Sequence, residues 1–248
     1  MKKFLLFSFL VLGFSFCFGE TTGFPKEYYK MKATIKKQNY FFDYLYPHIE
    51  NANRAILEER EFLLSIKGRN DLDEESQEID RLTKIARKYG VLNPYDFDKL
   101  LKKVDIVPPS QALAQAAVES GWGTSRFTKL GNNLFGHWTF GKIGIMPLKR
   151  DANAKHLVRI FKSFEDSIAA YMLNLNRTKA YFQFRNKRLE LRNNEKKITG
   201  IVLSQTMINY SQIRERYLKI LKNVIRKNSL QKYDEMFFEN LKKEKNEI

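Results

Sequence analysis

The segment that most constrains the fold is Val107-Pro108-Pro109-Ser110, together with the alanine-rich stretch that follows it. Two consecutive prolines cannot continue a helix and Ser110 is a good N-cap residue, so a new helix is expected over residues 111–120. Four residues of that stretch are alanines, and they fall on several faces of a helix. Because small residues let neighbouring elements approach closely, we expect this helix to be central and buried.

Helical periodicity covers much of the remaining chain. Apolar residues recur at spacings of three, four and seven between residues 45 and 66, where Pro47 is expected to kink or restart the helix and Gly68 to end it. Acidic residues at 71–75 are expected to open a second helix, which Gly90 ends. Further helices are expected, in chain order, at about 97–104, after a capping box formed by Ser163 and Asp166, at 195–206 and at 212–226.

A small β-lobe and two terminal segments complete the organisation. Apolar runs at 143–148 and 156–161, separated by a polar turn, predict a β-hairpin. Residues 227–248 form a charged tail that we expect to fray. The sequence therefore predicts a mostly α fold with a small β-hairpin lobe, preceded by a helical N-terminal region over residues 20–105.

Residues 1–19 resemble a secretory signal. Lys2 and Lys3 precede a short apolar run that ends in small residues, and a polar segment follows it. We therefore expect an exported protein of the periplasm or cell envelope. The alternative is a retained anchor, which would be the chain's only membrane contact; a lipidated Cys17 is disfavoured by Phe16 before it. Cys17 is the only cysteine, so disulfides, a cysteine nucleophile and a thiolate metal site are excluded from a cleaved chain.

The chain is strongly basic, with 44 lysines and arginines, 28 acidic residues and a net charge of +16. Such a surface attracts polyanions, which include nucleic acid, anionic lipid and acidic cell-wall polymers. Expected export argues against nucleic acid. The alternative is that these charges are merely solvated and have no dedicated partner.

Glu119 is the candidate catalytic residue. Gly121 and Gly123 will not prolong the alanine-rich helix, so Glu119 is expected at its C-terminal end. The negative end of the helix dipole and apolar neighbours both disfavour the carboxylate, which suits a general acid for glycoside cleavage. The alternative is an exposed surface glutamate that tolerates a small penalty.

Residues around Glu119 suggest a sugar-binding cleft. Flat aromatic faces and side-chain amides are the groups that bind sugar rings and their hydroxyl and acetamido substituents. Taken singly, the aromatic residues are equally typical of a core and the asparagines of capped turns. The candidate substrate-binding residues are Trp122, Asn132, Asn133, Phe135 and Trp138.

The string VPPSQALAQAAVESGWGTSRF, continuing to GNNLFGHW, resembles the bacterial glucosaminidase family, which includes flagellar muramidases and autolysins. The resemblance covers about residues 36–225 and is closest to the Bax-type members. It implies a lysozyme-like helical fold over residues 106–226, a β-lobe at 143–161, and Glu119 at the family's catalytic glutamate. It also implies a tyrosine near the cleft, for which we choose Tyr210 over Tyr217 further on; a core tyrosine is the alternative.

The sequence leaves the partner of Glu119 open. Several family members have been assigned a second carboxylate in the β-lobe, but Asp151 and Glu165 are unconvincing equivalents. An inverting mechanism needs a base and a retaining one a nucleophile. Otherwise the substrate's 2-acetamido group assists, or an internal hydroxyl attacks and gives an anhydro product.

We therefore expect an exported, monomeric peptidoglycan hydrolase of the β-N-acetylglucosaminidase type that cuts glycan strands between N-acetylated amino sugars. The alternatives are a non-catalytic wall-binding scaffold that retains the cleft, and a basic protein that binds lipid or nucleic acid. The three histidines, at 48, 137 and 156, are too scattered to predict a metal site. No cofactor is implied.

Overall fold

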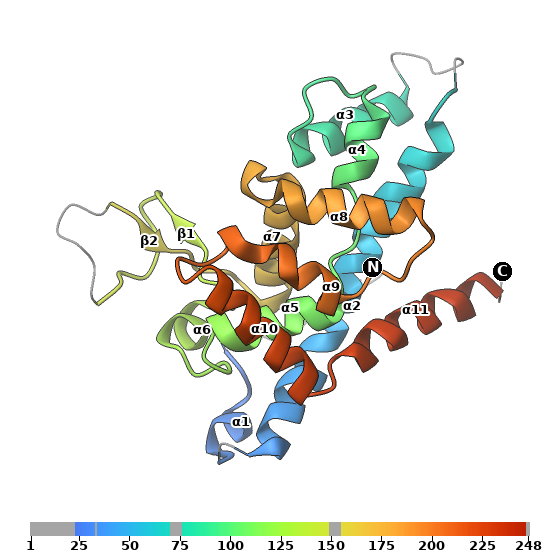
Figure 1. The fold of residues 1–248 in the computed structure, drawn as a ribbon. Helices are drawn as coiled ribbons and strands as arrows, with labels where there is room; N and C mark the ends of the chain where they lie inside the picture. Colours follow the sequence, from blue (N-terminus) through green and yellow to red (C-terminus); the bar gives the residue numbers. More distant parts are fainter. Residues whose placement is uncertain (1–22, 33, 70–75, 149–154, 247–248) are drawn as a thin grey trace, which may run out of the picture.

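The computed structural model describes residues 23–246 apart from 33, 70–75 and 149–154. Its described part is mostly helical with one small antiparallel sheet, which confirms the predicted fold class (Figure 1). In chain order the elements are α1 (Lys26–Lys30), α2 (Ile35–Ile66), α3 (Gln77–Tyr89), α4 (Phe97–Lys103), α5 (Pro109–Glu119), α6 (Arg126–Gly131), β1 (Trp138–Thr139), β2 (Leu157–Val158), α7 (Phe164–Arg177), η1 (Lys179–Tyr181), α8 (Phe182–Asn193), α9 (Gly200–Leu203), η2 (Ser204–Asn209), α10 (Glu215–Lys227) and α11 (Gln231–Asn246). None of the described helices is long and apolar enough to cross a membrane.

Helix α5 is the central element, as its alanines predict. Residues 109–117 are all buried, and α2, α9, α10 and α11 pack around the helix. The helix begins earlier than expected, because Pro108 is the N-cap and Pro109 occupies the first helical position, where its missing N–H costs nothing. Ser110 is therefore not the N-cap. Its hydroxyl donates instead to the Asp234 carboxylate, at 2.7 Å.

The N-terminal helices follow the predicted pattern in part. Helix α2 runs unbroken through Pro47, so this proline does not restart it. Helix α3 ends at Gly90, which adopts the left-handed conformation with φ 64°. The acidic segment 71–75 and the signal-like segment 1–19 lie outside the described residues.

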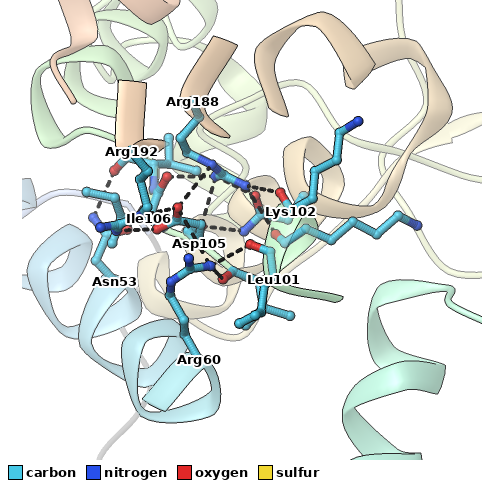
Figure 2. Close-up of polar contacts among 12 residues, drawn as sticks. Asn53, Arg60, Leu101, Lys102, Asp105, Ile106, Arg188 and Arg192 are labelled. Atoms are coloured by element: carbon cyan, nitrogen blue, oxygen red, sulfur yellow. Dashed lines mark hydrogen bonds and ion pairs between the residues drawn. The ribbon is translucent and has the colours of Figure 1, made fainter. Parts of the chain in front are cut away.

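A buried cluster around Asp105 ties the segment before α5 to α2 and α8 (Figure 2). Arg192 donates two hydrogen bonds, of 2.5 and 2.6 Å, to the Asp105 carboxylate. Arg188 is fully buried and donates to the carbonyls of Lys102, Lys103, Asp105 and Ile106, so it satisfies groups that the end of α4 leaves open. The cluster fixes the point from which α5 starts.

The β-lobe differs from the predicted hairpin. Strand β2 lies in the predicted second run, but its partner is β1, and only Ile145 of the first run bridges to Val158. Gly144 and Pro147 interrupt that run, since neither residue sustains a strand ladder. The predicted turn lies largely outside the described residues. Figure 1 shows β1 and β2 in a lobe that projects from the helical body.

The C-terminal half corrects two further expectations. Helix α8 was not predicted, and the single helix expected at 195–206 is a short α9 followed by η2. The described part of the charged tail is not frayed: α11 packs on the body through buried Tyr233 and Phe237. Asp234 on the same helix accepts hydrogen bonds from the amides of Ser110 and Gly200, at the starts of α5 and α9.

Candidate active site

A tight turn ends α5 at Glu119. Residues 121, 122 and 123 all have left-handed backbone conformations, which no helix can continue. The amide of Gly123 donates to the Ser120 hydroxyl at 2.7 Å, and a Cβ at position 123 would lie 2.5 Å from the Phe24 ring. Glycine is therefore required there, and the turn leaves Glu119 on the last residue of a rigid helix.

Glu119 lies in a cleft of about 900 Å³ between the β-lobe and the helices of the C-terminal half. Of the predicted site residues, Glu119, Phe135, Trp138 and Tyr210 line this cleft. The other lining residues are Gly136, His137, Arg159, Ala170, Asn174, Tyr181, Ser211, Gln212 and Ile213. Among the described lining residues, Glu119 is the only carboxylate.

The environment of Glu119 favours its protonated form. The side chain is half-buried, and this burial raises the pKa of the carboxyl above its ordinary value. A hydrogen bond from the Tyr217 hydroxyl to Glu119 Oε1, 2.7 Å long, opposes that shift without cancelling it. A carboxyl group with a raised pKa can deliver a proton near neutral pH.

Tyr217 is the site residue that sequence reasoning passed over. It is buried on α10, and its hydroxyl donates to Glu119, 98 residues away in the chain. Tyr217, Leu221 and Ile225 are the buried residues of this helix, and their spacing of four places them on the face toward α5. That spacing was the signal available in the sequence.

Tyr210, the tyrosine chosen from the sequence, lies beside Tyr217, but its hydroxyl is directed away from Glu119 to the Phe135 carbonyl. Its ring stacks on Tyr217 with centroids 5.7 Å apart and an interplanar angle of 2°. Its hydroxyl donates to the Phe135 carbonyl at 3.3 Å. Tyr210 therefore forms a wall of the cleft.

Trp122, Asn132 and Asn133 do not line the cleft, which corrects the predicted placement of all three. The left-handed backbone at Trp122 directs its ring against Phe41 and Phe42 of α2. Asn132 ends α6 in a left-handed conformation, and its side chain bonds to the backbone of residues 23, 161 and 162. The Asn133 side chain bonds to the backbone of residues 137 and 159. These amides hold the β-lobe to the body.

Phe135 and Trp138 contribute differently to the cleft. Phe135 is buried and stacks on Tyr171 of α7, with centroids 3.9 Å apart, so it supports the floor. Trp138 is 61% exposed and stacks on His156 across the small sheet at 4.0 Å. Its flat face is suited to packing against a sugar ring.

The described residues supply no second acid at the cleft. Asp151 lies outside the described residues. Glu165 is in the first turn of α7, as predicted, and its Oε1 lies 2.6 Å from His48 Nδ1, away from the cleft lining. Burial and the charge of Arg159 lower the pKa of His137 to about 4, so this cleft residue is neutral at pH 7. No described group of three or more His, Cys, Asp or Glu could hold a metal ion.

Comparisons with known proteins identify the family of the chain. A family model described as "Glucosaminidase: Mannosyl-glycoprotein endo-beta-N-acetylglucosaminidase" matches residues 95–230. The chain is also 31% identical over 194 residues to Protein bax of Escherichia coli (strain K12), which covers 76% of this chain and 68% of that protein. The chain belongs to the glucosaminidase family. No solved structure gives a significant match.

Membership of the glucosaminidase family, in its Bax-type branch, supports a glycosidase-type enzyme. The matched residues run from just before α4 to the start of α11, so they include α5, the β-lobe and α10. All the residues that line the cleft fall within this range.

Proposed function

We propose that the chain is an exported peptidoglycan hydrolase that cuts a β-1,4 bond between N-acetylated amino sugars, with Glu119 as the general acid. The observation that carries the proposal is the position of Glu119. It is the sole carboxylate of the described cleft, sits at the end of a buried helix, and has a raised pKa. A glycosidase needs such a group to protonate the leaving oxygen.

The first half of the reaction follows from the contacts of Glu119. Because Oε1 accepts the hydrogen bond from Tyr217, the acidic proton is carried on Oε2. Glu119 transfers this proton to the glycosidic oxygen as the bond from that oxygen to the sugar's anomeric carbon breaks. Positive charge then develops on the sugar that keeps the anomeric carbon, and Tyr217 stabilises the carboxylate left on Glu119.

The second half of the reaction is assigned to the substrate or to water. With Glu119 as the only described carboxylate in the cleft, the 2-acetamido oxygen can attack the anomeric carbon. Water then opens the resulting ring and gives up a proton that restores the acid form of Glu119. An internal hydroxyl attacking the same carbon, with its proton passing to the Glu119 carboxylate, would give an anhydro sugar instead. Trp138 and Tyr210 bind and orient the sugar in either case.

The cellular setting forms part of the same proposal. The signal-like segment 1–19 favours export to the periplasm or cell envelope. The net charge of +16 would retain the protein on an acidic wall. We propose peptidoglycan glycan strands as its partner, and a monomer as its working form.

The test is digestion of purified peptidoglycan by the wild type, Glu119→Gln and the matched control Glu165→Gln. Mass spectrometry of the released products distinguishes reducing GlcNAc, reducing MurNAc and anhydro ends. We expect Glu119→Gln to release fragments about 10²-fold or more slowly, because general acid catalysis contributes that much, and Glu165→Gln to match the wild type. Equal release by the Glu119 variant and the wild type would contradict the assignment.

A wall-binding scaffold is the second candidate function, favoured by the single carboxylate in the described cleft. Binding of the wild type to purified sacculi, without release of soluble fragments over a broad pH range, would support the scaffold and exclude the enzyme.

A further inference from the structure

A line of buried hydrogen bonds joins three helices and ends on Glu119. The Tyr171 hydroxyl on α7 donates to Gln115 Oε1 on α5, at 2.6 Å. Gln115 Nε2 donates to the Tyr217 hydroxyl on α10 at 3.1 Å, and that hydroxyl donates to Glu119 Oε1 at 2.7 Å. Tyr171, Gln115 and Tyr217 are all buried, so water does not compete for these bonds.

The chemistry of an amide sets the direction of this line. An amide nitrogen only donates and an amide oxygen only accepts. Gln115 Oε1 accepts two hydrogen bonds, one from the Tyr171 hydroxyl and one, 3.1 Å long, from Gln111 Nε2. Together these bonds hold the amide in one orientation. Gln115 Nε2 therefore faces Tyr217, whose oxygen accepts and whose single proton is left for Glu119.

We propose that Gln115 and Tyr171 are positioning residues that keep the transferable proton of Glu119 on Oε2. A Tyr217 hydroxyl free to rotate could instead accept a hydrogen bond from Glu119. The acidic proton would then sit on Oε1 and point at Tyr217 rather than toward the substrate. The hydrogen bond from Gln115 Nε2 to the Tyr217 oxygen removes this alternative, because the Tyr217 proton can no longer point at Gln115 and is directed at Glu119 Oε1. The inference rests on the proposed role of Glu119 as the acid.

The ring and the hydroxyl of Tyr171 make different contacts, so a substitution can remove one contact and keep the other. The ring stacks on Phe135 with an interplanar angle of 6° and supports the floor of the cleft. The hydroxyl contacts Gln115 and does not line the cleft. Tyr171→Phe therefore preserves the stack and removes only the hydrogen bond.

The experiment compares Gln115→Met, Tyr171→Phe and the matched control Ser167→Ala. Ser167 is a buried hydroxyl on the same helix as Tyr171 and accepts from the amide of Leu134, outside the line. For each protein we would measure kcat and KM on peptidoglycan, and titrate Glu119 by NMR with ¹³C-labelled glutamate carboxyls. We expect Gln115→Met to lower kcat about tenfold and to leave KM unchanged. This loss is smaller than the roughly 10²- to 10⁴-fold rate contribution of general acid catalysis as a whole.

Tyr171→Phe should also lower kcat, but by less than Gln115→Met does. The pKa of Glu119 should rise in both variants because the hydrogen bond from Tyr217 to Glu119 weakens. Ser167→Ala should leave both quantities at the wild-type value. Adding Gln115→Met to Tyr217→Phe should cause no further change, since Gln115 acts through the lost hydroxyl.

The proposal is overturned if Tyr171→Phe and Gln115→Met both keep the wild-type kcat and Glu119 titration, or if the effects of Gln115→Met and Tyr217→Phe multiply. Tyr171→Phe decides the matter alone if Gln115→Met fails to fold. The titration requires no activity. A wild-type Glu119 titration in both variants therefore refutes the positioning role even if neither is active, whereas full activity of Glu119→Gln refutes the proposed acid.

Discussion

Replacing Tyr217 by phenylalanine removes one hydroxyl and with it the 2.7 Å hydrogen bond to Glu119 Oε1. The ring remains available to stack on Tyr210. In the proposed mechanism Glu119 becomes a carboxylate as it gives up its proton, so the lost bond is one that strengthens during the reaction. Hydrogen bonds to charged groups are worth about 1.5–3 kcal/mol, which corresponds to a decrease in kcat of roughly 10- to 100-fold.

The same substitution shifts the pH dependence in a defined direction. Activity that requires protonated Glu119 falls as pH rises through the pKa of that group. Burial raises this pKa and the hydrogen bond from Tyr217 lowers it. Without the hydroxyl only the effect of burial remains, so the descending limb of the kcat profile should move to higher pH.

The assay is kcat against pH on peptidoglycan for the wild type, Tyr217→Phe and the comparison variant Tyr210→Phe. Tyr210 donates to the Phe135 carbonyl and not to Glu119, so its loss should leave the descending limb in place. The reasoning is refuted if the limb of Tyr217→Phe stays at the wild-type position or moves to lower pH, or if Tyr210→Phe alone moves it.

Three further predictions concern stability and specificity. Asp105→Asn should lower the free energy of unfolding by about 3 kcal/mol at pH 7, since it leaves buried Arg188 without its countercharge. Burial raises the pKa of Asp105, but Arg192 and the neighbouring arginines lower it below its ordinary value. Its stabilisation is therefore present above the unfolded pKa and lost toward acid, so urea titrations should show the gap between variant and wild type closing below about pH 4. Phe237→Ala should cost about 3–5 kcal/mol because α11 is packed, whereas a change under about 0.5 kcal/mol in thermal unfolding would indicate a fraying tail. Arg159→Met should lower kcat/KM about three- to tenfold more on peptidoglycan, which bears carboxylates, than on neutral chitooligosaccharides; equal losses on both would exclude an acid-binding role.

Local signals predicted the position of Glu119 and the helix that carries it. The prolines before α5, its alanines and the glycines after Glu119 are consecutive in the chain, and each acts on the backbone beside it. Glu119 could therefore be placed at a helix end from sequence alone. The small β-lobe was expected in the right part of the chain for the same reason, although the strand pairing was not.

Contacts between distant segments could not be predicted in this way. The left-handed backbone at Trp122 turns its ring toward α2, which no local pattern near residue 122 indicates. The choice between Tyr210 and Tyr217 depends on which face of α10 meets α5. The prediction for residues 227–248 was based on their charge and overlooked the spacing of Leu230, Tyr233 and Phe237. These apolar residues are three and then four positions apart, which is typical of a buried helix face.

The most direct test of the central claim compares Glu119→Gln with the wild type on two substrates. One is peptidoglycan, whose leaving sugar oxygen needs a proton; the other is an aryl glycoside of the same sugars with a dinitrophenolate leaving group, which departs without one. An acid at Glu119 predicts a loss of about 10²- to 10⁴-fold on peptidoglycan and a near wild-type rate of dinitrophenolate release. An equal loss on both substrates, or none on peptidoglycan, would contradict the account.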